Sequence, residues 1–235
     1  MKNLLNGLTL TILIAISIFM ASQFKYLSLQ AIENIVPKSS LTPTPILSPT
    51  NVPTPTPTLF TGTQKTFIYL YPSKFIPMSI KLDSKINPQN SLPKYPKNGW
   101  YIIATPKSLI ENKYSYLSFD TSVENITLPS FGWILSSSEL DEFFDEKLPI
   151  FGLNKNEISQ FKEDTLSQLK NSAFYQINYM IPKDKLLVNP AVNNILRYTF
   201  YFTNLDSAAT LSPPVINTPT RDGATVLELS AAFQN

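Results

Sequence analysis

The sequence contains no cysteine and no histidine, and only six of its 235 residues are glycine. Without cysteine the chain has no thiol nucleophile and cannot be attached through a lipidated cysteine, and packing alone must hold the fold because no disulfide can form. Without histidine it has no Ser-His-Asp arrangement and no imidazole metal ligand. It also lacks a glycine-rich phosphate loop and the spaced acids of a calcium loop. The sequence therefore predicts no cofactor and no bound metal.

The net charge of the chain is also small. The formal net charge is +2, only two arginines are present, and the lysines are spread along the chain without forming a basic cluster. Binding to nucleic acid depends on concentrated positive charge opposite the phosphates. The sequence therefore predicts no nucleic-acid partner.

Charged residues are absent from Asn3 to Phe24, a run whose centre is apolar. As a helix this run would be about 33 Å long, which matches a hydrocarbon core of about 30 Å. Lys2 before an apolar stretch also fits a cleaved secretory signal, but the residues around Ala21 form a poor cleavage site. We expect residues 1–24 to be a single-pass transmembrane signal-anchor, or else a signal that is cleaved. Either alternative places the rest of the chain outside the cytoplasm, at the cell membrane or secreted.

Proline and threonine dominate the next segment. Residues 37–60 contain seven prolines, six threonines and a single charged residue. Proline at this density opposes helices and central strands and favours an extended polyproline conformation, which would reach about 75 Å over such a segment. We expect residues 25–62 to be a proline-rich stalk and residues 63–235 to be an extracytoplasmic globular domain.

Short aromatic or β-branched runs dominate that domain and predict about eight strands, at 66–71, 78–83, 100–105, 114–121, 131–136, 174–181, 196–203 and 225–233. Pro72 and Pro77 bracket a turn between the first two runs, which we expect to form a hairpin. Alternation along 196–203 predicts a half-buried strand. Its core face would carry Leu196, Tyr198, Phe200 and Phe202, and its outer face Arg197, Thr199, Tyr201 and Thr203.

Two helical patterns interrupt the strands. Apolar positions on one face predict a helix from residue 139, with a solvated acidic face opposite. The core residues would be Leu140, Phe143, Phe144 and Leu148, and the solvated acids Glu139, Asp141, Glu142, Asp145 and Glu146. Asn154 followed by Glu157 predicts the start of a second helix, running to about residue 171. Its buried stripe would be Ile158, Phe161, Leu166 and Leu169. The expected class is α+β, a mainly antiparallel β-sheet with an inserted pair of short amphipathic helices, preceded by the transmembrane helix.

Five residues are candidates for ligand binding, and none is assigned a catalytic role. Asp120 and Glu228 are the acids best placed for carboxylate chemistry on a glycan, which needs two carboxyl groups facing each other. Trp100 and Trp133 are able to stack on sugar rings, although a tryptophan within a strand more often fills the core. Should Arg197 meet Asp120 or Glu228 across the sheet, the resulting ion pair would either orient a polar ligand or, as we favour, close the sheet.

Several motifs resemble a family of uncharacterised bacterial exported or envelope proteins. They are IYLYP at 68–72, YPKNGW at 95–100, EKLPIFGLNKNEI at 146–158 and TVLE at 225–228. The resemblance implies an exported envelope domain but brings no known activity. The chain departs from the family pattern at Lys107 and Ser108, at 118–120 and at Leu229. If an aromatic platform matters in relatives, these departures reduce it here.

The predicted function is a membrane-tethered, stalked extracytoplasmic domain with a non-catalytic binding or structural role at the cell envelope. Its partners would be the membrane, through the N-terminal helix, and an envelope glycan or protein. The alternative is a carboxylate-dependent glycan hydrolase. Such an enzyme should show two carboxyl groups converging in an aromatic-lined cleft, with at least one pKa raised by burial.

Overall fold

The computed structural model describes residues 59–235. The predicted anchor or signal, and the stalk up to residue 58, lie outside the described residues. The first strand begins at Leu59, so residues 59–62 of the predicted stalk belong to that strand. Between residues 59 and 235, no helix combines the length and the apolar character needed to cross a membrane.

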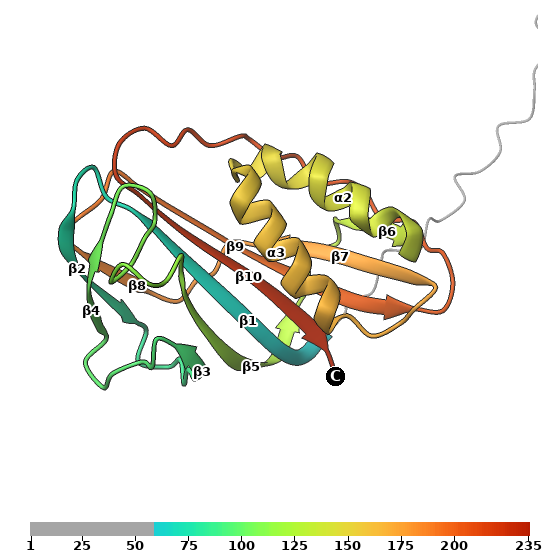
Figure 1. The fold of residues 1–235 in the computed structure, drawn as a ribbon. Coiled ribbons are helices and arrows are strands. Elements are labelled where there is room, and N and C mark those ends of the chain that lie inside the picture. Colours follow the sequence, from blue (N-terminus) through green and yellow to red (C-terminus); the bar gives the residue numbers. More distant parts are fainter. Residues whose placement is uncertain (1–58) are drawn as a thin grey trace, which may run out of the picture. The chain divides into compact units, whose positions relative to one another are not determined.

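Ten strands form two sheets, and two α-helices lie across one face of the larger sheet (Figure 1). The larger sheet has the order β3-β5-β1-β10-β9-β7-β6, and the smaller sheet has the order β4-β2-β8. The strands are β1 (Leu59–Tyr71), β2 (Ile76–Leu82), β3 (Gln89–Leu92), β4 (Trp100–Ala104), β5 (Leu117–Thr127), β6 (Trp133–Ser136), β7 (Phe174–Met180), β8 (Leu186–Asn189), β9 (Asn194–Leu205) and β10 (Thr225–Gln234). The helices are α2 (Leu140–Lys147) and α3 (Lys155–Gln168), and short 3-10 helices flank α2 at Ser137–Glu139 and Leu148–Phe151.

The predicted class is confirmed in its main features, because the domain is mainly β, mostly antiparallel, and carries two helices. Each of the eight expected runs overlaps an observed strand, with ends that differ by up to seven residues, and β3 and β8 are additional. The predicted hairpin is wrong. β1 lies between β5 and β10, whereas β2 belongs to the other sheet. The reason lies in β1 itself: residues 67–70 are buried on both faces, so the strand needs neighbours on both sides and the turn after Tyr71 carries the chain into the second sheet.

The centre of the larger sheet is covered on both faces. β9 and β10 run parallel to each other, and nine of the ten residues of β10 are buried. The predicted core face of β9 is confirmed, since Tyr198, Phe200 and Phe202 pack beneath the helices. The expectation that β9 is only half-buried is wrong, because residues 199, 201 and 203 on its other face are buried as well. A second layer therefore covers that face.

The helical layer follows the sequence pattern closely. The predicted core residues of α2 are buried and its five acids are exposed. The side chain of Asn154 caps α3 by accepting hydrogen bonds from the backbone N–H groups of Asn156 and Glu157. The carboxylate of Glu157 in turn accepts a hydrogen bond from the backbone N–H of Asn154 at 2.7 Å. The buried stripe differs toward its C-terminal end, because α3 ends at Gln168, before residue 171, and Leu169 follows it and is only partly buried. Thr165 faces the sheet and Leu166 is exposed, because positions 158, 161 and 165 lie on one helical face.

The connection from β9 to β10 must cross the sheet because the two strands are parallel. Arg221 fixes this crossover to the start of α3 by a bidentate bond to Glu157, at 2.8 and 2.9 Å. Glu157 is fully buried and also accepts a bond from the hydroxyl of Tyr71 at 2.6 Å. Burial, and then this bond to a carboxylate, raise the pKa of Tyr71 to about 12. The network ties the end of β1, the helix and the crossover together.

The buried stripe of α3 is tested by two alanine variants. Phe161→Ala removes a fully buried ring beneath the helix and is expected to lower the free energy of unfolding by about 3–5 kcal/mol. Leu166→Ala, on the exposed side of the same helix, is expected to cost about 1 kcal/mol or less. Urea denaturation of both variants measures the difference. Equal losses would place Leu166 in the core and contradict the observed face.

Candidate functional site

A polar strip crosses the face of the larger sheet that points away from the helices. At one end of this face the smaller sheet packs over β1 and β10 around Ile68, Leu70 and Val226. At the other end Phe60 and Tyr201 belong to a separate small cluster. Between the two clusters the sheet carries buried polar side chains, which are Thr66, Thr199, Glu228 and Ser230. Thr66 and Ser230 share a hydrogen bond of 2.9 Å.

Arg197 and Glu228 form the centre of this strip. They are direct register partners on the parallel strands β9 and β10. The guanidinium donates from Nε to one carboxylate oxygen of Glu228 at 2.7 Å and from Nη2 to the other at 3.0 Å. Nη2 also bonds the carboxylate of Asp184 at 2.8 Å, and Nη1 donates to the backbone carbonyl of the same residue. Arg197 therefore holds two acids and a backbone carbonyl at once.

Burial dominates the electrostatics of this cluster. It raises the pKa of Glu228, whose side chain is 4% exposed, and Arg197 opposes that rise by bonding the ionised form. Burial likewise disfavours the charged form of Arg197, but its bonds to Glu228 and Asp184 outweigh this effect and raise its pKa. Removing one partner leaves a buried charge without compensation, which is strongly destabilising.

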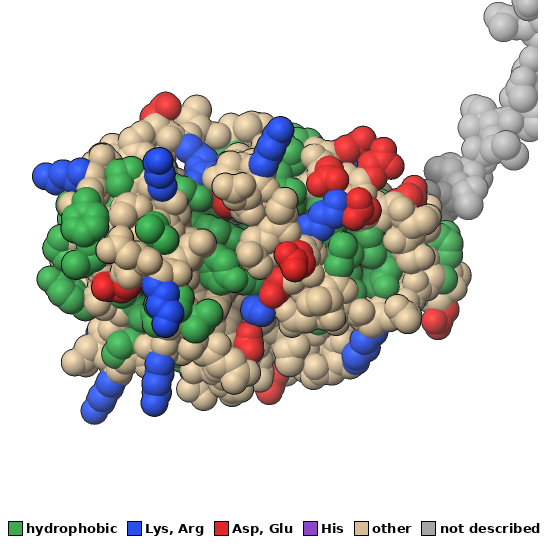
Figure 2. All heavy atoms as spheres, in the orientation of Figure 1, with side chains coloured by type: hydrophobic (Ala, Val, Ile, Leu, Met, Phe, Trp, Pro, Cys, Tyr) green, Lys and Arg blue, Asp and Glu red, His purple; other side chains and the backbone are tan. Residues whose placement is uncertain are grey.

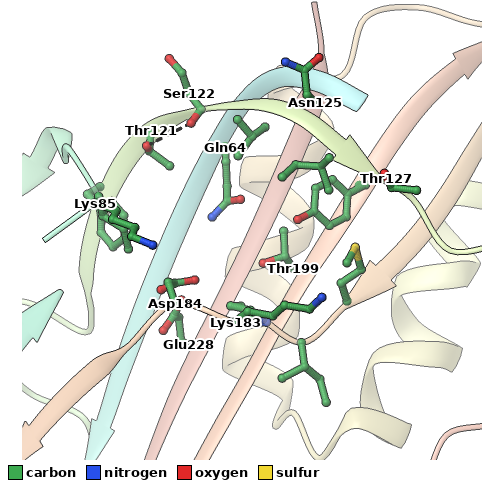
Figure 3. Close-up of a pocket in the computed structure, with 18 residues that line it drawn as sticks. Gln64, Lys85, Thr121, Ser122, Asn125, Thr127, Lys183, Asp184, Thr199 and Glu228 are labelled. Carbon is green, nitrogen blue, oxygen red and sulfur yellow. Dashed lines mark hydrogen bonds between the residues drawn. The ribbon is translucent and has the colours of Figure 1, made fainter. Parts of the chain in front are cut away.

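An open cavity of about 500 Å³ lies above this cluster (Figure 3). Gln64 on β1, Thr199 on β9 and Glu228 on β10 contribute to the cavity from the sheet, and residues 121–127 of β5 bound one side. Met180 at the end of β7 and residues 181–184 after it bound the other side and bring in Lys183 and Asp184. Lys85 and Ile86 come from the connection between β2 and β3, so five strands and two connections build the cavity.

The lining of the cavity combines neutral hydrogen-bonding groups with positive charge. Its two carboxylates, Asp184 and Glu228, are both engaged by Arg197. Lys85 and Lys183 are exposed and line the cavity without an ion pair to either of these acids. Neutral polar groups come from Gln64, Thr121, Ser122, Asn125, Thr127 and Thr199, and the apolar lining includes Phe119, Tyr201, Ile126 and Met180. The site is suited to a polar ligand with hydroxyl or anionic groups.

The candidate tryptophans do not line this cavity. Trp100 is 1% exposed in the core beneath the smaller sheet, where its indole N–H donates to the carbonyl of Pro93 at 2.9 Å. Trp133 is partly buried on the helical side and packs edge-on against Phe143, with ring centroids 5.1 Å apart. Both rings therefore fill hydrophobic clusters, one on each side of the larger sheet.

The candidate acids lie on opposite faces of the larger sheet. Glu228 pairs with Ile68 of β1, which in turn pairs with Leu117 of β5, so these positions share one face. Asp120 is three residues beyond Leu117, and strand alternation turns it to the other face. Its carboxylate accepts a bond from Asn90 at 2.9 Å. The sheet therefore separates Asp120 from Glu228, and Glu228 meets Asp184 instead.

Sequence reasoning missed most of the cavity residues. Asp184 and Lys183 lie in a polar connection between two strands, where no periodic pattern reports which way a side chain points. Tyr201 was expected to point outward from a half-buried strand, and it does lie on that face, but β5 and residues 180–184 cover it. One signal was available in β9. Its outer face alternates polar residues with the large apolar residues of the core face, and such a strand is able to form a second, polar contact surface.

Comparison of the chain with protein-family models, with curated proteins and with solved structures finds no match. The class that the fold defines is a mainly β domain of two sheets with a two-helix layer. Among residues 59–235, no group of three or more acidic, histidine or cysteine side chains is placed to hold a metal ion.

The contribution of Arg197 to the stability of the domain can be measured directly. Arg197→Met leaves Glu228 buried without its partner, and the free energy of unfolding is expected to fall by about 3–5 kcal/mol. The double variant Arg197→Met with Glu228→Leu removes both charges and should recover most of this loss. Lys65→Met is the control, because it breaks the partly exposed Lys65–Asp164 pair and should cost about 1 kcal/mol or less. A single Arg197 variant as stable as this control would contradict the argument.

Proposed function

We propose that this chain is a membrane-tethered, stalked extracytoplasmic domain that binds an envelope ligand in the cavity above β9 and β10 and catalyses no reaction. The proposed ligand class is a glycan, and the chain is proposed to belong with the envelope proteins that its motifs resemble. The tether is the apolar segment 1–24, and the stalk is the Pro/Thr-rich segment that follows it.

The observation that carries the binding proposal is the chemistry of the cavity. Its carboxylates are committed to Arg197, and its free groups are amides, hydroxyls and two lysines beside a few aromatic and aliphatic side chains. Such groups recognise hydroxyl-rich ligands. Hydrogen bonds depend on distance and angle, so they select the positions of the ligand hydroxyls, and apolar side chains contact the apolar faces of the ligand.

One observation favours the alternative of a glycan hydrolase. Asp184 and Glu228 converge on the same guanidinium nitrogen in a cavity that Phe119 and Tyr201 line, and burial raises the pKa of Glu228. A raised carboxyl pKa is what a general acid requires. Against this alternative, Arg197 bonds both oxygens of Glu228, and these bonds favour the ionised carboxylate over the protonated form that a general acid needs. We therefore place binding first.

The tether is tested by fractionating cells that produce the full chain. The protein is expected in the membrane fraction at its full length, with the domain open to protease added from outside. Removal of residues 1–24 should leave the chain in the cytoplasm. Full-length protein free in the cytosol would contradict the tether, and a shortened form in the medium would identify segment 1–24 as a cleaved signal.

Ligand binding is tested by calorimetric titration of the full chain in detergent with soluble fragments of envelope glycan. Lys183→Gln is expected to weaken binding about fivefold, the worth of about 1 kcal/mol for one polar contact. Lys185→Gln, two residues along and outside the cavity lining, is the matched control and should bind like the parent chain.

Glycan cleavage is measured on the same samples. Binding without cleavage by the parent chain supports the proposal. Cleavage that Asp184→Asn abolishes would replace it with the hydrolase alternative. No binding by the parent chain, or equal losses in Lys183→Gln and Lys185→Gln, would remove the cavity as the ligand site.

A further inference from the structure

The outer face of the smaller sheet is apolar where a solvated sheet is usually polar. In β2, β4 and β8 the residues that point inward complete the core with the larger sheet. The register places Pro77 beside Ile103, Ser79 between Tyr101 and Asn189, and Lys81 beside Leu187 on the outer face. Three of these seven side chains are large and hydrophobic, and Pro77 adds a fourth apolar group.

These side chains are well exposed. Tyr101 is 76% exposed, Leu187 is 55% exposed and Ile103 is 38% exposed, and Phe75, just before β2, is 59% exposed. Strands with one buried face normally alternate between apolar residues inside and polar residues outside. Single exposed apolar residues are common, but a contiguous group on one sheet face marks a contact surface. Nothing between residues 59 and 235 covers this group.

Lysines are frequent around the smaller sheet. The segments that form and flank it, residues 72–115 and 181–192, hold nine lysines and three acidic residues, and two of these lysines, Lys85 and Lys183, line the cavity. The helical layer, residues 137–171, has the opposite balance, with eight acidic residues and four lysines. Figure 2 shows hydrophobic side chains and lysines together at the end of the molecule that β2 and β4 occupy in Figure 1, and most of the acidic side chains elsewhere. The small net charge of the whole chain conceals this separation.

We propose that the outer face of the smaller sheet docks on an anionic lipid surface. Aromatic and aliphatic side chains enter the region of the lipid headgroups, where a tyrosine ring is particularly favourable, and the surrounding lysines remain among the phosphates. Each lysine near such a surface contributes attraction to anionic lipid that salt weakens. A hydrophilic polymer of the envelope would satisfy the lysines but would leave Ile103, Leu187 and Phe75 in water.

Because the domain is tethered to the membrane, a weak contact between the smaller sheet and the lipid is enough for docking. This step rests on the proposed membrane attachment, because a domain joined to the membrane by a stalk of limited reach meets that surface at a high effective concentration. The cavity and its ligand are not involved. Docking of the smaller sheet would hold the domain in one orientation against the membrane, with the helical layer directed away from the lipid.

The first experiment measures the partition of residues 54–235 onto vesicles by co-sedimentation. The described residues of this segment, 59–235, supply all the members of the three hydrophobic clusters, so the segment is expected to fold alone. Binding is expected to vesicles of equal parts phosphatidylcholine and phosphatidylglycerol, to fall with added salt, and to be absent from phosphatidylcholine alone. Tyr101→Ser with Ile103→Ser should weaken it about tenfold, and Lys81→Gln about fivefold.

Matched controls lie on the helical layer. Leu166→Ser changes an exposed apolar residue of α3, and Lys147→Gln changes a partly exposed lysine of α2. Both variants should leave vesicle binding unchanged. Thermal unfolding of every variant confirms that the domain is folded. The proposal is overturned if the control variants lose as much binding as the sheet variants, if lipid charge has no effect, or if Tyr101→Ser disperses a dimer in analytical ultracentrifugation without changing vesicle binding.

The second experiment uses the full chain, which has no cysteine and accepts a single label. An environment-sensitive fluorophore on Ser79→Cys, in the middle of the outer face, is expected to shift its emission to the blue in vesicles that contain phosphatidylglycerol. The same label on Ser167→Cys, on α3, should not shift. Equal emission from both sites would overturn the docking. If the full chain does not stay in the membrane but residues 54–235 still bind anionic vesicles, the tether fails and the docking stands.

Discussion

The parallel pairing of β9 and β10 at the centre of the larger sheet is the constraint on which the rest of the structure depends. Parallel neighbours need a crossover, and covered faces on both sides leave every polar side chain there in need of a partner. The two arginines of the chain meet these two needs. Arg197 neutralises the acid that the register places beside it on β10, and Arg221 fastens the crossover to the helix that covers the other face. Each is matched to a deeply buried glutamate.

The two faces of the larger sheet are covered in different ways, and this difference creates the candidate site. On the helical side, aromatic rings fill the layer continuously. On the other side, the smaller sheet covers only one end, and a small cluster around Phe60 covers the other. The gap between them exposes the polar strip to a cavity. The proposed ligand site and the proposed lipid contact therefore fall on two separate surfaces, one recessed and polar, the other apolar and basic.

Patterns contained within one element were predictable from the sequence. The capping pair Asn154 and Glu157 and the buried face of α2 follow from spacings of three and four residues. Pairing between distant segments was not. The hairpin was expected from prolines that mark a turn, but a turn does not report which sheet receives the next strand. β3 and β8 are short, and β3 is polar, so neither gives a strand signal. Glu228 was one of the two acids considered as a partner of Arg197. The position of Asp120 depends on the register of β1 with β5, and the position of Asp184 depends on a loop, and neither is visible in a local pattern.

The position of β10 has a consequence for how the protein is made. This strand lies between β1 and β9 in space, yet it is the last of the ten to leave the ribosome. Until then β1 and β9 have no common neighbour, and the nascent chain holds an incomplete sheet with open edges. The last strand in the sequence is therefore the one that joins the two halves of the larger sheet.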